Sequence, residues 1–237
     1  MFYDLYLLSY ILLIPVFIFT LWAQIKVKTT FNKSSKVLVG LTGAAAARRI
    51  LDENGLTDVQ ILRVRGHLTD HYDPRANVIR LSESVYDANT AAAVGVAAHE
   101  AGHAVQHATG YTDIRLRMAM IPVCQFGSYA AMPLFLIGLY LGYAGEVGGD
   151  IGYAFMLAGI LFYSLATLFQ LVTLPVEFNA SNRAMQALEG CRMMNSGELA
   201  ASRRVLSAAA MTYVAALFSS LVSLLRLIAI AGGRRRR

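Results

Sequence analysis

Two histidines and a glutamate stand within one short segment that otherwise consists of small, apolar residues. His99-Glu100-Ala101-Gly102-His103 has the pattern HExxH, and alanine and valine dominate on both sides of it. Residues four apart share one face of a helix, so both imidazoles can reach one ion at about 2.0–2.1 Å. Glu100 would accept a proton from a zinc-bound water, whose pKa the metal lowers toward about 7, and the hydroxide would attack a polarised carbonyl. The pattern predicts one catalytic Zn²⁺ held by His99 and His103, with Glu100 as general base.

HExxH has only three fixed positions, so other interpretations compete with it. A solvated helix face could carry the pattern by chance, but these polar groups would be costly in so apolar a helix unless they were paired or metal-bound. A catalytically silent metallopeptidase-like scaffold or adaptor for a membrane protein complex would have no use for Glu100. A metal transporter needs polar groups deep in several crossings, where only Gln125, Gln170 and Arg226 are available.

A catalytic zinc needs a third protein ligand and an open position. His107 continues the spacing of four, but His99 and His107 would lie about 12 Å apart along a helix, too far to share one ion. Glu177 follows the apolar run that ends at Pro175, where a new helix is expected to begin. It is a candidate ligand because a membrane hairpin would return it to the face that holds HExxH. An ordinary acid in the first turn of a helix is the alternative that spacing leaves open.

Composition and apolar runs indicate an integral membrane protein. Of the 237 residues, 56% are hydrophobic and 15% are charged, whereas soluble domains carry about 25% charged residues. The net charge is +6, but no basic patch is interleaved with aromatic residues, so no nucleic acid is expected as a partner. Runs of about 20 apolar residues can cross a bilayer as helices. Four such runs lie near residues 5–23, 118–143, 151–175 and 208–231, the second and third forming a hairpin with a turn at 145–150.

Lysines and arginines flank these runs in the pattern of the positive-inside rule. This pattern puts residues 24–117 and 176–205 on the cytoplasmic side, with the amino terminus and the hairpin turn outside. The tail Arg234–Arg237 breaks the scheme, because four simple crossings would put it outside as well. Either the last run does not cross the membrane in a single pass, or the orientation of the whole chain is the reverse of the one inferred from the loops.

The stretch 37–110 has the mixed character of a small α+β domain. Alternating apolar residues indicate its strands, and alanine-rich segments indicate its helices. Glycine, proline and aspartate indicate the loop. The expected order is a helix at 44–51, strands at 60–65 and 78–82 with a loop at 67–77 between them, and a helix at 90–109 capped by Asp87 or Asn89.

Three blocks of sequence resemble the bacterial membrane-bound neutral zinc metallopeptidases called YugP-type, and the resemblance covers nearly the whole chain. That family is in turn similar to the gluzincin membrane proteases, in which two helix histidines and a downstream glutamate bind zinc. The resemblance implies that Glu177 is the third ligand. It also implies an endopeptidase of the bacterial plasma membrane that acts on membrane or membrane-proximal proteins. The blocks are Asp70-His71-Tyr72-Asp73-Pro74 with Val78-Ile79-Arg80-Leu81-Ser82, then His99-Glu100-Ala101-Gly102-His103-Ala104-Val105-Gln106, and Leu174-Pro175-Val176-Glu177-Phe178.

The expected fold is a mainly α integral membrane protein with about four transmembrane helices and a small α+β zincin-like metallopeptidase domain. Protein or peptide substrates and the lipid bilayer are its expected partners, and a membrane protein complex or a homo-oligomer is left open. The expected division is a membrane anchor at 1–24, the zincin-like domain at 25–117, a transmembrane hairpin at 118–175, the third-ligand helix and loop at 176–205, and a membrane helix with a basic tail at 206–237.

The resemblance also suggests where substrate would bind. In related zincins, a strand before the HExxH helix binds the substrate backbone by strand addition, and Val78–Ser82 fits by position, with a plain structural edge strand as the alternative. His71, Tyr72 and Arg183 are candidates for stabilising the oxyanion. The family usually has aspartate where this chain has Asn179, whose amide can hold a ligand by hydrogen bonding but carries no charge.

Overall fold

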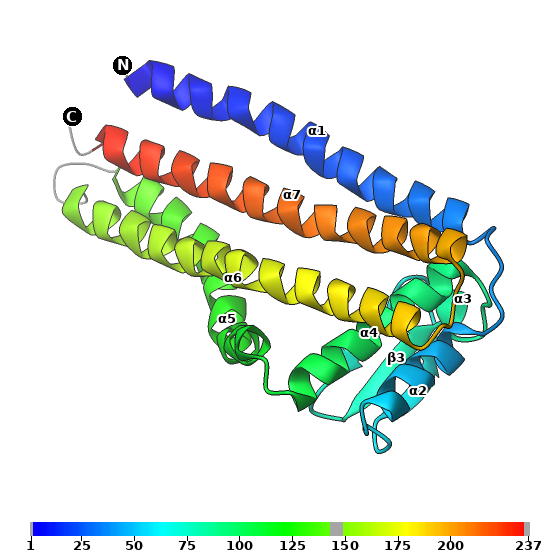
Figure 1. Cartoon of the computed structure of the whole chain (residues 1–237). Coiled ribbons are helices and arrows are strands. Elements are labelled where there is room, and N and C mark those ends of the chain that lie inside the picture. Colours follow the sequence, from blue (N-terminus) through cyan, green and yellow to red (C-terminus); the bar gives the residue numbers. More distant parts are fainter. Residues whose placement is uncertain (1, 143–148, 235–237) are drawn as a thin grey trace. The chain divides into compact units, whose positions relative to one another are not determined.

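The structure, a computed structural model of the chain, describes residues 2–142 and 149–234 (Figure 1). These residues form two compact units. The helical unit is drawn from residues 1–22, 116–173 and 213–237, and the α+β unit from residues 23–115 and 174–212. The protein is mainly α-helical with one small sheet, as the sequence predicts.

Within the described residues, four helices are long and apolar enough to cross a bilayer, which confirms the predicted membrane protein. They are longer than the apolar runs: α6 has 42 residues, or about 63 Å at 1.5 Å per residue, against a hydrocarbon core of about 30 Å. Each therefore contributes residues to both units. The four helices are α1 (Phe2–Ser34), α5 (Thr112–Leu141), α6 (Gly149–Gly190) and α7 (Ser196–Arg234).

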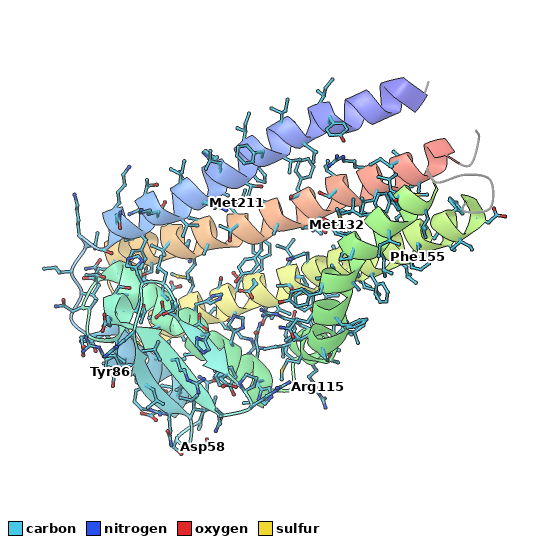
Figure 2. The ribbon with its side chains drawn as sticks, turned by 180° about the vertical axis from the view of Figure 1, so that it is seen from behind. Asp58, Tyr86, Arg115, Met132, Phe155 and Met211 are labelled. Atoms are coloured by element: carbon cyan, nitrogen blue, oxygen red, sulfur yellow. The ribbon has the colours of Figure 1, made fainter. Side chains whose placement is uncertain are left out.

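In the helical unit, α5 and α6 approach each other backbone to backbone. A Cβ atom on Gly138 would lie 2.5 Å from the carbonyl oxygen of Gly152, and one on Gly159 would lie 2.7 Å from that of Ala131. Small residues permit such close packing between helices in a bilayer, where apolar burial gives little drive for association. The predicted turn falls mostly on residues 143–148, outside the described residues. Figure 2 shows the side chains along this pair, with Met132 on α5 and Phe155 on α6.

The first turn of α1 and the last turn of α7 lie at the same end of the helical unit as the ends of α5 and α6 that flank residues 143–148 (Figure 1). The last apolar run belongs to a spanning-length helix like the other three. Helix α7 therefore ends, at Arg234, at the same end of the helical unit at which α1 begins.

The prediction that a new helix begins after Pro175 is wrong, because α6 passes through Pro175 without a break. A proline inside a helix removes one hydrogen bond and costs about 3 kcal/mol. Residues on both sides of it are packed, since Thr173 is 3% exposed and Val176 is 0% exposed. Packing on both sides offsets the cost of the proline, and the helix continues to Gly190.

The α+β unit contains a three-stranded sheet with the order β1-β3-β2. Strand β1 (Gln60–Val64) is parallel to β3 (Val78–Ser82), and β2 (His71–Asp73) is antiparallel to it. Strand β2 lies within the stretch predicted as a loop, where three residues are too few for a pattern of alternation. Helices α2 (Gly43–Glu53), α3 (Glu83–Tyr86) and α4 (Ala91–Ala108) complete the unit's own elements.

Strand β3 is the central strand, so the expectation that Val78–Ser82 is an edge strand open to substrate is wrong. Gln60 to Val64 pair along one side of it, and His71 to Asp73 pair with Arg80 to Val78 along the other. Beyond this pairing, the backbone N–H of Ser82 donates to Asp70 Oδ1 at 2.7 Å. Strand addition requires an unpaired edge, which β1 and β2 provide and β3 does not.

Helix α4 is buried along most of its length. Thr90, rather than Asp87 or Asn89, is its N-cap, and the Thr90 hydroxyl accepts a hydrogen bond from Ala93 N at 3.3 Å. Its alanines pack with Ile50 of α2 and Ile79 of β3 in one apolar core. The small side chains let neighbouring elements approach this helix closely, and that packing positions the HExxH residues.

Candidate metal centre

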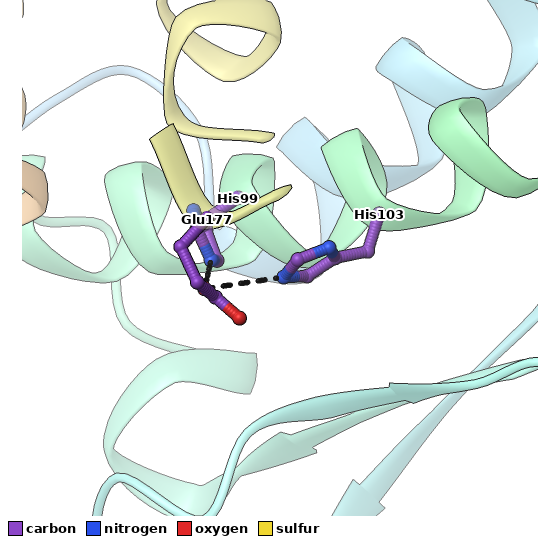
Figure 3. Close-up of side chains that lie close together, drawn as sticks. All are labelled: His99, His103 and Glu177. Atoms are coloured by element: carbon purple, nitrogen blue, oxygen red, sulfur yellow. Dashed lines mark hydrogen bonds and ion pairs between the residues drawn. The ribbon is translucent and has the colours of Figure 1, made fainter. Parts of the chain in front are cut away.

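His99, His103 and Glu177 converge at one point of the α+β unit (Figure 3). Glu177 Oε2 lies 3.2 Å from His99 Nε2 and 3.5 Å from His103 Nε2. One ligand atom from each residue lies within 4.8 Å of the other two. A tetrahedral ion with bonds of about 2.0–2.1 Å separates its ligand atoms by about 3.3–3.4 Å. Two neutral imidazole nitrogens and a carboxylate at these distances fit a zinc ion.

The low exposure of Glu177, His103 and Glu100 is what a buried metal site requires. Glu177 is 2% exposed, and His103 and Glu100 are each 8% exposed. Burial would lower the pKa of His103, but the hydrogen bond to Glu177 and the negative charges of Glu100 and Glu177 outweigh burial and raise this pKa. Carboxylates buried beside an imidazole therefore favour a positive charge at this point, and a metal cation supplies one.

Helix α6 reaches this point because Gly102 has no side chain. A Cβ at position 102 would meet the backbone of Ala180, three residues beyond Glu177. The glycine within HExxH thus lets α4 and α6 touch through their backbones.

A second layer of polar side chains contacts the two histidines. Gln106 Oε1 lies 2.9 Å from His103 Nδ1, and Ser181 Oγ lies 3.1 Å from His99 Nδ1. Asn179 Oδ1 accepts hydrogen bonds from Gln106 Nε2 at 2.9 Å and from Arg183 Nε at 2.8 Å. Asn179 and Arg183, both predicted as site residues, are therefore joined to His103 through Gln106.

Sequence reasoning missed the contacts of Gln106 and Ser181, although a positional signal existed. Gln106 is three residues after His103 and Ser181 is four residues after Glu177, so each shares a helix face with a candidate ligand. Spacing shows that such residues are neighbours, but it does not show which atom of which ring they reach.

Asp70 is a further polar residue near the candidate site, close enough for the charge of Glu100 to affect its pKa. Its carboxylate accepts hydrogen bonds from the Ser82 backbone and hydroxyl, and burial together with the negative charge of Glu100 raises its pKa despite these bonds. Ser82 is thus bound to Asp70 at the end of β3, next to the start of α3.

His71 and Tyr72 have contacts within or beside the β2 segment. His71 Nδ1 lies 2.9 Å from Thr69 O, and the Tyr72 hydroxyl donates to Asn77 Oδ1 at 3.3 Å. The Tyr72 ring lies 6.1 Å from that of His107, centroid to centroid. Successive residues of a strand point to opposite faces, so His71 points away from the face that Tyr72 shares with α4. The identity of the oxyanion donor stays a prediction.

Comparison with known proteins identifies the family to which this chain is similar. A family model described as "Putative neutral zinc metallopeptidase" matches residues 9–232. A protein of Bacillus subtilis (strain 168), named "Putative membrane protease YugP", is 50% identical over 211 residues, which cover 88% of this chain and 90% of that protein. No solved structure matches the chain.

Proposed function

Because this chain belongs to the neutral zinc metallopeptidase family, we propose that it is a membrane-embedded zinc endopeptidase that cleaves membrane or membrane-proximal proteins. The convergence of His99 Nε2, His103 Nε2 and Glu177 Oε2 within 4.8 Å carries the proposal. One catalytic ion bound by these three residues would supply a Lewis acid that polarises the scissile carbonyl and lowers the pKa of a water molecule.

Glu100 is the proton carrier of the proposed reaction. It follows His99 on α4, so its carboxylate lies beside the ligand cluster rather than completing it. It takes a proton from the attacking water and delivers that proton to the leaving amine. At 8% exposure the carboxylate has little competing bulk water around it.

The test compares the wild-type protein with Glu100→Gln, both as full-length chains in detergent. The wild type is expected to contain zinc and to cleave an unfolded protein such as casein. Glu100→Gln is expected to keep zinc and lose cleavage, since the amide cannot accept the proton. If Glu100→Gln cleaves as fast as wild type, this assignment fails, and zinc-loaded wild type without cleavage would favour a silent scaffold.

We place substrate at the outer edge of β2 rather than at β3. Strand β2 is an edge strand of the sheet and packs against α4, the HExxH helix. An extended peptide that pairs with this edge would run beside the helix that bears Glu100. Replacing Tyr72 by proline removes one N–H of β2, and loss of cleavage with zinc retained would support pairing at this strand.

We also propose that the α+β unit faces the cytoplasm of a bacterial cell. Lys26, Lys28, Lys33, Lys36 and Arg115 all belong to this unit, as the positive-inside rule requires. The basic tail Arg234–Arg237 argues against this orientation, because four crossings would put it on the outer side. In a cysteine-free background, Lys36→Cys should resist an impermeant thiol reagent in intact cells and Asp150→Cys should react. The reverse pattern would put the site outside.

A further inference from the structure

Gln106 is a completely buried amide that joins the two helices of the metal centre. It is 0% exposed and lies one turn beyond His103 on α4. Its Oε1 lies 2.9 Å from His103 Nδ1. Its Nε2 donates to Val176 O at 2.8 Å and to Asn179 Oδ1 at 2.9 Å, both on α6. Every polar atom of the amide therefore has a partner.

The partners on α6 determine which way this amide points. The carbonyl of Val176 can only accept a hydrogen bond, so the NH₂ group of Gln106 must face it. The oxygen of Asn179 is fixed in the same way, because Arg183 Nε donates to it and a guanidinium cannot accept. Two independent groups of fixed polarity thus turn Gln106 Oε1 toward His103.

The orientation of the amide determines the tautomer of His103. Because Oε1 of Gln106 can only accept, Nδ1 of His103 must carry a proton. A neutral imidazole protonated at Nδ1 has its lone pair at Nε2, the atom that lies 3.5 Å from Glu177 Oε2. The lone pair therefore points to the place where a metal would be bound.

His99 has no comparable constraint from its partner at Nδ1. Ser181 Oγ lies 3.1 Å from that nitrogen, and a hydroxyl can donate or accept by rotating. The two histidines of HExxH thus differ: the hydrogen bond at Nδ1 determines the tautomer of His103 but does not determine that of His99.

We propose that Gln106 is a positioning residue that keeps the Nε2 lone pair of His103 directed at the metal. The proposal rests on the proposed function, because it takes Nε2 of His103 as a zinc ligand. An outer partner that orients a ligating histidine typically contributes 10–100-fold to metal affinity. Gln106 also bonds to α6, so the experiment has to separate its effect on His103 from its effect on helix packing.

Two substitutions of similar size separate these effects. Gln106→Met removes all hydrogen bonds of the side chain. Gln106→Glu keeps an oxygen acceptor for His103 Nδ1 but loses the amide donors to Val176 and Asn179. In full-length protein in detergent, Gln106→Met is expected to weaken zinc binding about 10–100-fold in competition with a chelator. Gln106→Glu is expected to stay within a few-fold of wild type. Both should lower the thermal midpoint of the zinc-free protein, since both lose the bonds to α6.

The matched controls are Gln186→Met and Gln186→Glu, because Gln186 is exposed on α6. Both are expected to bind zinc and unfold like wild type. If Gln106→Glu loses as much zinc affinity as Gln106→Met, or if Gln106→Met binds zinc as tightly as wild type, the inference is overturned. A wild-type protein that binds no zinc overturns the proposed function itself, and the inference with it.

A measurement on the wild type alone does not depend on how the variants fold. Long-range ¹H–¹⁵N spectra of the zinc-loaded protein with ¹⁵N-labelled histidine distinguish a protonated from a metal-bound ring nitrogen. His103 is expected to show a protonated Nδ1 and a coordinated Nε2, and coordination through Nδ1 would contradict the inference.

Discussion

A Cβ atom on Gly102 would lie 2.6 Å from the carbonyl oxygen of Ala180, so α4 and α6 are in backbone contact at the candidate metal centre. Gly102 is the residue before the second histidine of HExxH, and Ala180 is three residues after Glu177. The third candidate ligand can approach the histidines because this position has no side chain.

Gly102→Ala is therefore expected to destabilise the protein by about 1–3 kcal/mol, the usual cost of forcing an extra carbon into a packed core. Zinc affinity should fall as well, because α6 must move away together with Glu177. Thermal unfolding of the zinc-free protein and bound zinc would measure the two effects. Gly190→Ala, at a position with no atom within 4 Å of the added Cβ, is the control and should behave like wild type. Wild-type zinc affinity in Gly102→Ala would contradict the role of this contact.

Glu177→Ala is expected to lose zinc while the α+β unit stays folded. The substitution removes one of three ligand groups, so affinity should fall by more than the roughly 10–100-fold typical of an outer partner. Bound zinc after gel filtration measures the loss, and circular dichroism reports the fold. Glu189→Ala on the exposed face of the same helix is the control. Unchanged zinc content in Glu177→Ala would remove this residue from the metal centre.

Thr90→Ala is expected to destabilise the HExxH helix by about 0.5–2 kcal/mol, since it removes the hydroxyl that caps Ala93 N. Thr90→Ser keeps an acceptor at this position and should restore most of the stability. Chemical unfolding in detergent would measure both. Equal stability of Thr90→Ala and Thr90→Ser would show that the hydroxyl does not cap the helix.

Asp70 is expected to make stability depend on pH. Its pKa is raised in the folded protein, so the folded state binds this proton more tightly than the unfolded state does. The resulting stabilisation is present at acidic pH and is lost as pH rises from the unfolded value, about 3.9, through the raised folded value. Relative to wild type, Asp70→Asn should therefore gain stability as pH increases through this window.

Asp73 gives the comparison of opposite sign for this measurement. A hydrogen bond from Arg80 holds the pKa of Asp73 below its usual value. Its contribution is present above the unfolded pKa and is lost as pH falls, so Asp73→Asn should lose stability relative to wild type as pH increases through the acidic range. Unfolding of the zinc-free protein from about pH 3 to about pH 6 would compare the slopes, because the window of Asp73 lies below the ordinary carboxyl pKa of about 3.9 and that of Asp70 lies above it. Slopes of the same sign would contradict the assignment for Asp70.

The parts of the fold that were predictable are those set by local pattern. The HExxH helix and the four apolar runs follow from periodicity and length, and the structure has helices at all of these places. Glu177 could be proposed because the hairpin returns the chain to the face that it left. These inferences need only neighbouring residues and the thickness of a bilayer.

The parts that were not predictable depend on pairing and packing between distant segments. Nothing in Val78–Ser82 itself shows that both β1 and β2 pair with it, and a three-residue strand such as β2 has no period to detect. Pro175 normally predicts a helix end, and only the packing of Thr173 and Val176 explains why α6 continues. The contact of Gln106 with His103 depends on side-chain direction, which spacing alone does not supply.

The candidate metal ligands of the α+β unit come from chain segments before and after the helical hairpin, and this arrangement sets an order of events during synthesis. Glu177 lies 78 positions after His99, with α5 and most of α6 between them. A nascent chain thus carries both histidines well before the carboxylate exists. The ligand set is complete only after the hairpin has been made and α6 has returned to the unit. Zinc binding by all three residues, and any hydrolysis that depends on it, would therefore begin only after this part of α6 has been synthesised.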